Sequence, residues 1–171
     1  MSTYPPEERE PRVTITHPNR DKPVVQATRA TVILLLLASA ALVLIITVGG
    51  WNVLAGMIPV DIAYVIVYLV LAYYASRWNR GVLPVASALA VLLLIFAAVA
   101  GPGWFERDKT GYAEPGLPAG LLGLLTLLLV PLQILLVAFA MRGFQQGWNV
   151  ELERREPGPA EQFTQAPPQP A

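Results

Sequence analysis

The chain has no cysteine and a single histidine among its 171 residues. Without cysteine there is no disulfide framework, thiolate nucleophile or cysteine metal site. The one histidine, His17, lies in a polar, proline-containing segment, which argues against a serine–histidine–aspartate triad. Zinc-binding His-Glu-x-x-His patterns and phosphate-binding glycine loops are missing from the sequence as well. The sequence therefore predicts no catalytic residues, no metal and no cofactor, and we do not expect an enzyme.

Charge is also scarce. Asp, Glu, Lys and Arg make up 14% of the residues, and the formal net charge is zero. A soluble domain carries about 25% charged residues, whereas a neutral chain has no general attraction to nucleic acid. We therefore do not expect nucleic acid as a partner.

The deficit falls in four long apolar runs, at residues 31–50, 57–76, 82–101 and 118–141. A run of about 20 residues covers about 30 Å as a helix, which is the thickness of the hydrocarbon core of a bilayer. The fold class predicted is an all-α integral membrane protein with four transmembrane helices in an antiparallel up-down bundle over residues 30–144. Gly49 and Gly50 are expected to end the first helix, and Pro102 and Gly103 the third.

The flanking segments are polar and rich in proline. Residues 1–29 are predicted to be a disordered cytoplasmic tail, because the alternating segment Arg12 to His17 has no evident strand to pair with. Residues 145–171 are predicted to begin with a short helical extension, Glu151 to Glu156, and to end in a disordered proline-rich tail.

The basic residues are distributed unequally between the two sides of this four-helix arrangement. Ten fall in the two tails and the middle turn, and only Arg107 and Lys109 fall on the other side. By the positive-inside rule both termini are expected to be cytoplasmic. The tryptophans agree, with Trp51 and Trp104 expected at the outer interface and Trp78 and Trp148 at the inner one. Arginine outnumbers lysine, and Ala, Leu, Val and Gly dominate, which often accompanies a GC-rich bacterial genome. We therefore expect a bacterial inner (plasma) membrane.

Asp61 is the only carboxylate inside an apolar run, and Tyr64 and Tyr68 follow it on the same helical face. Two interpretations are open. If the second helix begins at Asn52, Asp61 is a deeply buried intramembrane acid and a candidate for proton or ion binding. If it begins near Met57, Asp61 stabilises the helix start at the outer interface, with Pro59 in the first turn. After Gly49 and Gly50 the chain needs several residues to reverse direction, which favours the second interpretation.

Small and polar residues recur on one face of the other runs. Ala86, Ala90, Ala97 and Gly101 share a face of the third run, and Ala119, Thr126, Gln133 and Ala140 share a face of the fourth. Such faces favour close helix packing, and polar side chains on them hydrogen-bond across helices. The candidate packing residues are therefore Ser39, Thr126 and Gln133.

The longest connection between runs, Trp104 to Gly116, carries the alternating charges Glu106, Arg107, Asp108 and Lys109. A charged loop belongs in water, so we expect a solvated link at the outer surface.

Two functions remain open. The first is a non-enzymatic accessory, assembly or scaffold subunit of a membrane complex, whose partners are the lipid bilayer and other membrane proteins or a second copy of itself. The alternative is a small oligomeric transporter or channel that uses the Asp61, Tyr64 and Tyr68 face.

Overall fold

The computed structural model describes residues 13–54, 56–107, 111 and 113–155. The chain divides into two units, Asn19–Asn149 and a smaller unit formed by the two flanking segments. In the larger unit the described secondary structure is helical, with α1 at Pro23–Gly49, α2 at Ile58–Ser76, α3 at Val82–Phe105 and α4 at Ala119–Gln145. All four helices are long and apolar enough to cross a membrane. The prediction of four helices that are long and apolar enough to span a membrane is therefore confirmed.

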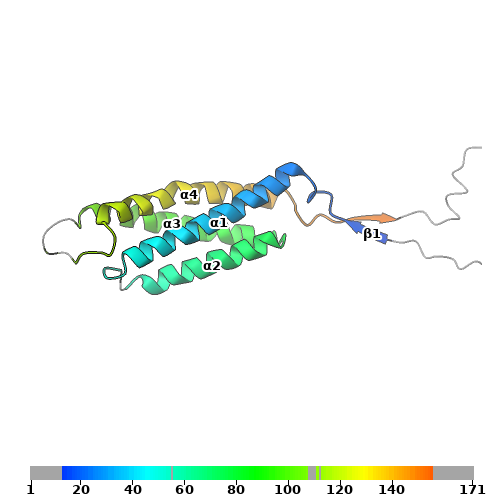
Figure 1. Ribbon diagram of the computed structural model, residues 1–171. Helices are drawn as coiled ribbons and strands as arrows, with labels where there is room; N and C mark the ends of the chain where they lie inside the picture. Colours follow the sequence, from blue (N-terminus) through cyan, green and yellow to red (C-terminus); the bar gives the residue numbers. More distant parts are fainter. Residues whose placement is uncertain (1–12, 55, 108–110, 112, 156–171) are drawn as a thin grey trace, which may run out of the picture. The chain divides into compact units, whose positions relative to one another are not determined.

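The four helices lie side by side (Figure 1). Helix α1 packs against both α2 and α4, and α3 packs chiefly against α4. Two hydrogen bonds show that α1 and α2 run antiparallel, because Arg29 near the start of α1 bonds to Ser76 at the end of α2, and Thr47 near the end of α1 bonds to Asp61. Helices α2 and α3 make little contact with each other.

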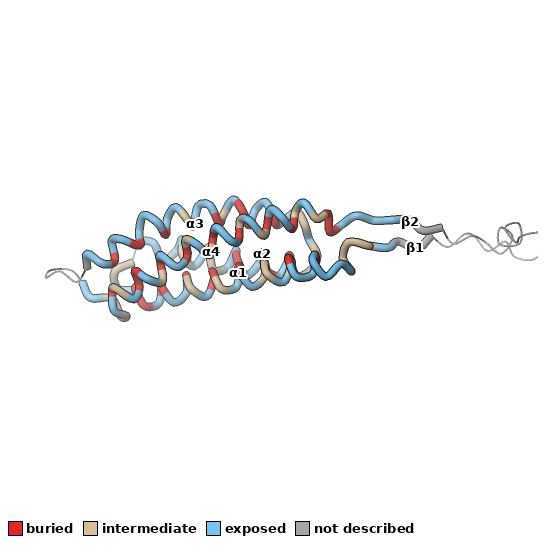
Figure 2. The backbone as a smooth tube through the Cα atoms, turned by 90° about the horizontal axis from the view of Figure 1, so that it is seen from above, coloured by how far each residue is buried: buried red, intermediate tan, exposed pale blue. Residues whose placement is uncertain are grey.

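The predicted small-residue faces are the buried faces of α3 and α4. Ala86, Ala90 and Ala97 are at most 3% exposed, and Ala119, Thr126, Gln133 and Ala140 are also buried. Figure 2 shows such buried positions recurring along the helices, as one face of each turns toward its neighbours. Small side chains on both helices let the two backbones approach closely, which increases van der Waals contact.

Helix α1 begins earlier than the apolar run does. It starts at Pro23, whereas the run starts at Thr31, so the prediction of a disordered tail through residue 29 is wrong for this part. Proline suits the first helical turn because its missing N–H would be unpaired there anyway. Val25 and Thr28 are buried, and Thr28 accepts a hydrogen bond from Gln146. The hydropathy of the sequence does not reveal the first two turns of α1, because these turns contain polar residues and are stabilised by packing.

Helix α3 continues past its predicted end. It runs through Pro102 to Phe105, so the prediction that Pro102 and Gly103 stop it at Gly101 is wrong. Proline in a helix removes one hydrogen bond and tends to bend the helix. The final turn nevertheless carries Trp104, which is 5% exposed. Burying an aromatic side chain of this size offsets the cost of the proline.

The smaller unit contains a two-stranded antiparallel pair, β1 at Val13–Thr16 and β2 at Leu152–Arg155. The predicted helical extension at Glu151 to Glu156 is therefore wrong, and the tail strand does have a partner. Thr16 Oγ1 donates to the Leu152 carbonyl at 3.3 Å, and His17 lies 3.4 Å from the Glu151 carboxylate. Single-segment patterns miss this pairing because the two strands come from opposite ends of the chain. The proline-rich tail predicted to be disordered lies outside the described residues.

Candidate functional site

Asp61 lies in the first turn of α2. The helix begins at Ile58, with Met57 as its N-cap residue and Pro59 in the first turn. This confirms the later of the two helix starts considered from the sequence. Asp61 is half-buried. Its side chain turns toward α1 and is hydrogen-bonded there.

The partner of Asp61 is Thr47, in the last two turns of α1. Thr47 Oγ1 lies 3.1 Å from Asp61 Oδ2 and 2.7 Å from the Val43 carbonyl oxygen, so its single hydroxyl proton is placed between two acceptors. Sequence reasoning missed Thr47. The available signal was its position just before Gly49 and Gly50, which brings the end of α1 beside the start of α2.

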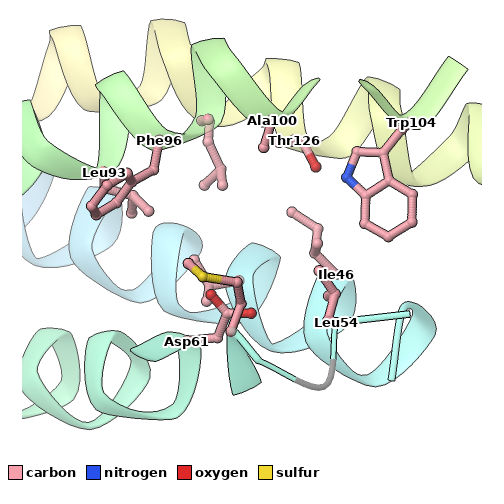
Figure 3. A pocket seen from close by; sticks show the side chains of 12 residues that line it. Ile46, Leu54, Asp61, Leu93, Phe96, Ala100, Trp104 and Thr126 are labelled. Atoms are coloured by element: carbon pink, nitrogen blue, oxygen red, sulfur yellow. The ribbon is translucent and has the colours of Figure 1, made fainter. Parts of the chain in front are cut away.

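Asp61 lines a cavity of about 100 Å³ (Figure 3). Apolar side chains form most of the wall, among them Ile46 of α1 and Leu93 and Phe96 of α3. Thr126 of α4, which the sequence predicts as a packing residue, lines the same cavity. Figure 3 shows Asp61 and Trp104 on opposite sides of the space, with the indole nitrogen on the side that faces the cavity. The cavity is therefore apolar with a few polar groups, which is the usual composition of a binding pocket.

Tyr64 and Tyr68 share the inward side of α2 with Asp61, but their environments differ. Tyr64 is half-buried, and its ring meets that of Tyr68 edge to face, with 5.8 Å between centroids. Tyr68 is fully buried, and its hydroxyl donates to Gln133 Oε1 at 2.9 Å. The predicted face therefore begins at a half-buried acid and ends inside the packed core.

Ser39 and Gln133 complete a polar chain with Tyr68 across three helices. Gln133 Nε2 donates to Ser39 Oγ at 2.9 Å, and Ser39 Oγ donates to the Leu35 carbonyl at 2.7 Å. All three side chains are fully buried. We call Ser39, Gln133 and Tyr68 the central polar chain. The sequence predicted Ser39 and Gln133 as packing residues, and the structure joins them to Tyr68.

The predicted outer-loop residues are described only in part. Glu106 is exposed directly after α3, and the Arg107 guanidinium lies 5.3 Å from the centroid of the Trp104 ring. Asp108 and Lys109 lie outside the described residues. Glu106 and Arg107 are not among the residues that line the Asp61 cavity.

An aromatic and arginine cluster at the other end of the helices was not predicted as a unit. The Arg29 guanidinium lies 4.2 Å from the centroid of Trp78, whose ring meets fully buried Trp148 edge to face at 5.8 Å. Trp78 adopts a positive φ of 62°, which is unusual for a bulky side chain. The cluster joins the start of α1, the turn after α2 and the segment after α4, and it fixes that end of the helices.

The chemistry available at these sites is limited. Within residues 13–155, leaving aside the gaps noted above, there is no group of three His, Cys, Asp or Glu side chains that could hold a metal ion. The central polar chain is internally paired. What remains is the Asp61 carboxylate, which can accept a hydrogen bond or pair with a cation at the wall of an apolar cavity.

Comparisons with protein families, with characterised proteins and with solved structures found no match to this chain. What can be said of its class comes from its own residues. Among the described residues, four helices are long and apolar enough to span a bilayer, which indicates a membrane protein.

Proposed function

We propose that the chain is a non-enzymatic assembly or accessory subunit of a larger complex in the plasma membrane. The observation that supports this most is the central polar chain, in which Tyr68, Gln133 and Ser39 hydrogen-bond to one another. Polar groups that line a transport path need to be open to the passing solute. These three serve instead to lock α1, α2 and α4 together.

The proposal includes an up-down crossing of the membrane with both termini in the cytoplasm. Its support is the ten-to-two distribution of basic residues in the sequence. It also agrees with the antiparallel contact of α1 and α2. A bacterial inner membrane fits the composition.

A small oligomeric transporter or channel is the alternative, and one observation favours it. Asp61 lines a cavity and is half-buried, so an ion could pair with it. However, the alternative also needs Tyr68, whose hydroxyl is already bonded to Gln133. An Asp61→Asn variant that is folded but loses flux in proteoliposomes would support transport, whereas unchanged flux would remove Asp61 from such a mechanism.

The assembly role is tested by isolating the protein from its native membrane. The membrane is cross-linked or extracted in a mild detergent, and the purified material is sized and analysed by mass spectrometry. We expect one or more membrane proteins in fixed stoichiometry with the chain. A protein that is recovered only as a monomer, with no stoichiometric partner under either condition, contradicts the proposal.

A further inference from the structure

Asp61 has no cationic partner among the residues that the structure describes. Its one side-chain hydrogen bond is with Thr47, at 3.1 Å. The ion pair found among the described residues joins His17 and Glu151 and does not involve Asp61. A carboxylate beside apolar walls is costly unless it is paired. The arrangement is therefore complementary to a positive charge that the described residues do not supply.

The transmembrane segments of this chain cannot provide that charge. The runs 31–50, 57–76, 82–101 and 118–141 contain no lysine or arginine. A second copy would bring only Arg107 and Lys109, from the loop after α3, to this end of the helices. In the structure the Arg107 guanidinium already lies over its own Trp104 ring, and Lys109 lies outside the described residues. We therefore take a different protein as the source of the cation, and the experiment below distinguishes it from a second copy.

The size of the cavity limits what can enter it. At about 100 Å³ it is smaller than the ~150 Å³ cavity that takes up benzene, and far smaller than the ~300 Å³ at which drug-sized pockets begin. It has room for the end of one side chain. An ammonium group on a slender alkyl stem fits this space better than a broad, planar guanidinium does.

A second, shallower hollow of about 350 Å³ lies beside the same part of α2. It is lined by Pro59, Val60, Ala63, Tyr64 and Val67 of α2 and by Leu89 of α3. Since α2 and α3 make little contact with each other, an apolar groove is left along α2. Both hollows lie between α2 and α3, because Asp61 and Phe96 line the first and Tyr64 and Leu89 line the second.

We propose that the groove between α2 and α3 receives a transmembrane helix of a different protein, and that a lysine of this helix pairs with Asp61 in the cavity. This inference rests on the proposed assembly role and names the chemistry of the partner. Lysine supplies the missing charge, and the apolar remainder of the helix covers the groove. The pair would fix both the position and the orientation of the partner helix.

Two synthetic membrane-spanning leucine–alanine peptides test the proposal. They are identical except for one position near one end, which is lysine in the first and glutamine in the second. Binding is measured by energy transfer in phosphatidylcholine vesicles, with the protein labelled at a cysteine introduced at Ser2. The proteins compared are the unchanged chain, Asp61→Asn, and the charge-matched control Glu106→Gln, whose side chain is exposed and lines neither hollow.

The unchanged chain and Glu106→Gln should bind the lysine peptide at least about tenfold more tightly than the glutamine peptide. Asp61→Asn should bind both peptides equally, with a helical circular dichroism spectrum and cooperative melting that show it to be folded. Asp61→Gln replaces it if the asparagine variant does not fold. Equal binding by the unchanged chain, or a lysine preference that persists without Asp61, overturns the proposal.

Other occupants give different results in the same vesicles. Asp61-dependent binding of octylamine without discrimination between the peptides would assign the cavity to a free amphiphilic amine and overturn the proposal. Asp61-dependent dimerisation without peptide would assign it to a second copy, with the same consequence. A native complex that stays intact in Asp61→Asn would contradict only the lysine pair, whereas the absence of any native partner would contradict the assembly role itself.

Discussion

The Tyr68 hydroxyl donates a 2.9 Å hydrogen bond to the Gln133 side chain across 65 residues of sequence. Both side chains are fully buried. Gln133 uses its amide nitrogen to reach Ser39, so one glutamine links α2, α4 and α1. In a membrane, where helices gain nothing from exclusion of water, such bonds and close packing hold helices together.

Tyr68→Phe should lower the free energy of unfolding by about 0.6 kcal/mol, and by at most ~1.7 kcal/mol. The change removes the hydroxyl and leaves the ring in place, so Gln133 loses one partner while the packing is kept. Tyr73→Phe is the matched control, because Tyr73 lies one and a half turns further along α2 and its side chain is 58% exposed. Unfolding in a denaturing detergent, followed by circular dichroism, measures both. Equal effects of the two variants would mean that the Tyr68 bond contributes nothing.

Sequence patterns could predict the helices and their buried faces, but not which residues meet. Asp61, Tyr64 and Tyr68 share a helical face, and the residues of α4 that recur every seven positions are buried as expected. Periodicity shows which side of a helix is turned inward. It carries no information about which helix lies opposite, so the pairing of Tyr68 with Gln133 and of Asp61 with Thr47 could not be derived.

The tryptophans show a similar limit. Their positions in the sequence place them near the ends of the helices, where tryptophan is expected at the membrane–water interface. Trp148 is nevertheless fully buried and Trp104 is 5% exposed, while Trp51 is 52% exposed. The first two are packing residues in this fold, since Trp148 packs against Trp78 and Trp104 lines the Asp61 cavity. Only contacts from distant segments distinguish these roles.

Gly123→Ala should destabilise the protein by about 1 kcal/mol or more, because the added methyl group is overpacked. A Cβ at Gly123 would lie 2.8 Å from Phe105 Cζ and 3.1 Å from Trp104 Cβ. Gly120→Ala is the matched control in the same helix, since a Cβ there meets nothing within 4 Å. It should be neutral or stabilising by up to ~1 kcal/mol through helix propensity. The two variants are compared by their melting temperatures in detergent. Equal shifts would show that α3 and α4 are not closely packed at this point.

Arg29→Lys should cost about 0.5 to 2 kcal/mol in spite of the conserved charge. The guanidinium lies 4.2 Å from the Trp78 centroid and donates to the Ser76 carbonyl at 2.6 Å. A lysine cannot reproduce a planar stack and a directed bond together. Arg77→Lys is the control, because Arg77 is exposed and directly follows Ser76 at the end of α2. If Arg29→Lys melts no lower than Arg77→Lys, the cluster around Trp78 does not stabilise this end.

Thr47→Val should reduce stability by about 1 kcal/mol, since the Asp61 carboxylate loses its hydrogen bond while the side-chain shape is kept. Thr31→Val is the control in α1, because the Thr31 hydroxyl bonds only to the Ala27 carbonyl and is exposed. The two variants are compared by denaturing-detergent unfolding. The Asp61→Asn/Thr47→Val double variant completes the test, because the two single effects should not add if the residues interact directly. Strict additivity would show that the 3.1 Å contact is without energetic consequence.

Single cysteines introduced at Ser2 and at Glu114 should react from opposite sides of the membrane. The chain has no cysteine of its own, so each variant carries one reactive thiol. Glu114 is exposed in the connection between α3 and α4, on the side that carries only two basic residues, which the positive-inside rule assigns to the exterior. A membrane-impermeant maleimide should therefore label Glu114→Cys in intact cells and Ser2→Cys only after permeabilisation. Labelling of both from the outside, or of neither, contradicts the up-down arrangement, and the reverse pattern contradicts the cytoplasmic placement of the termini.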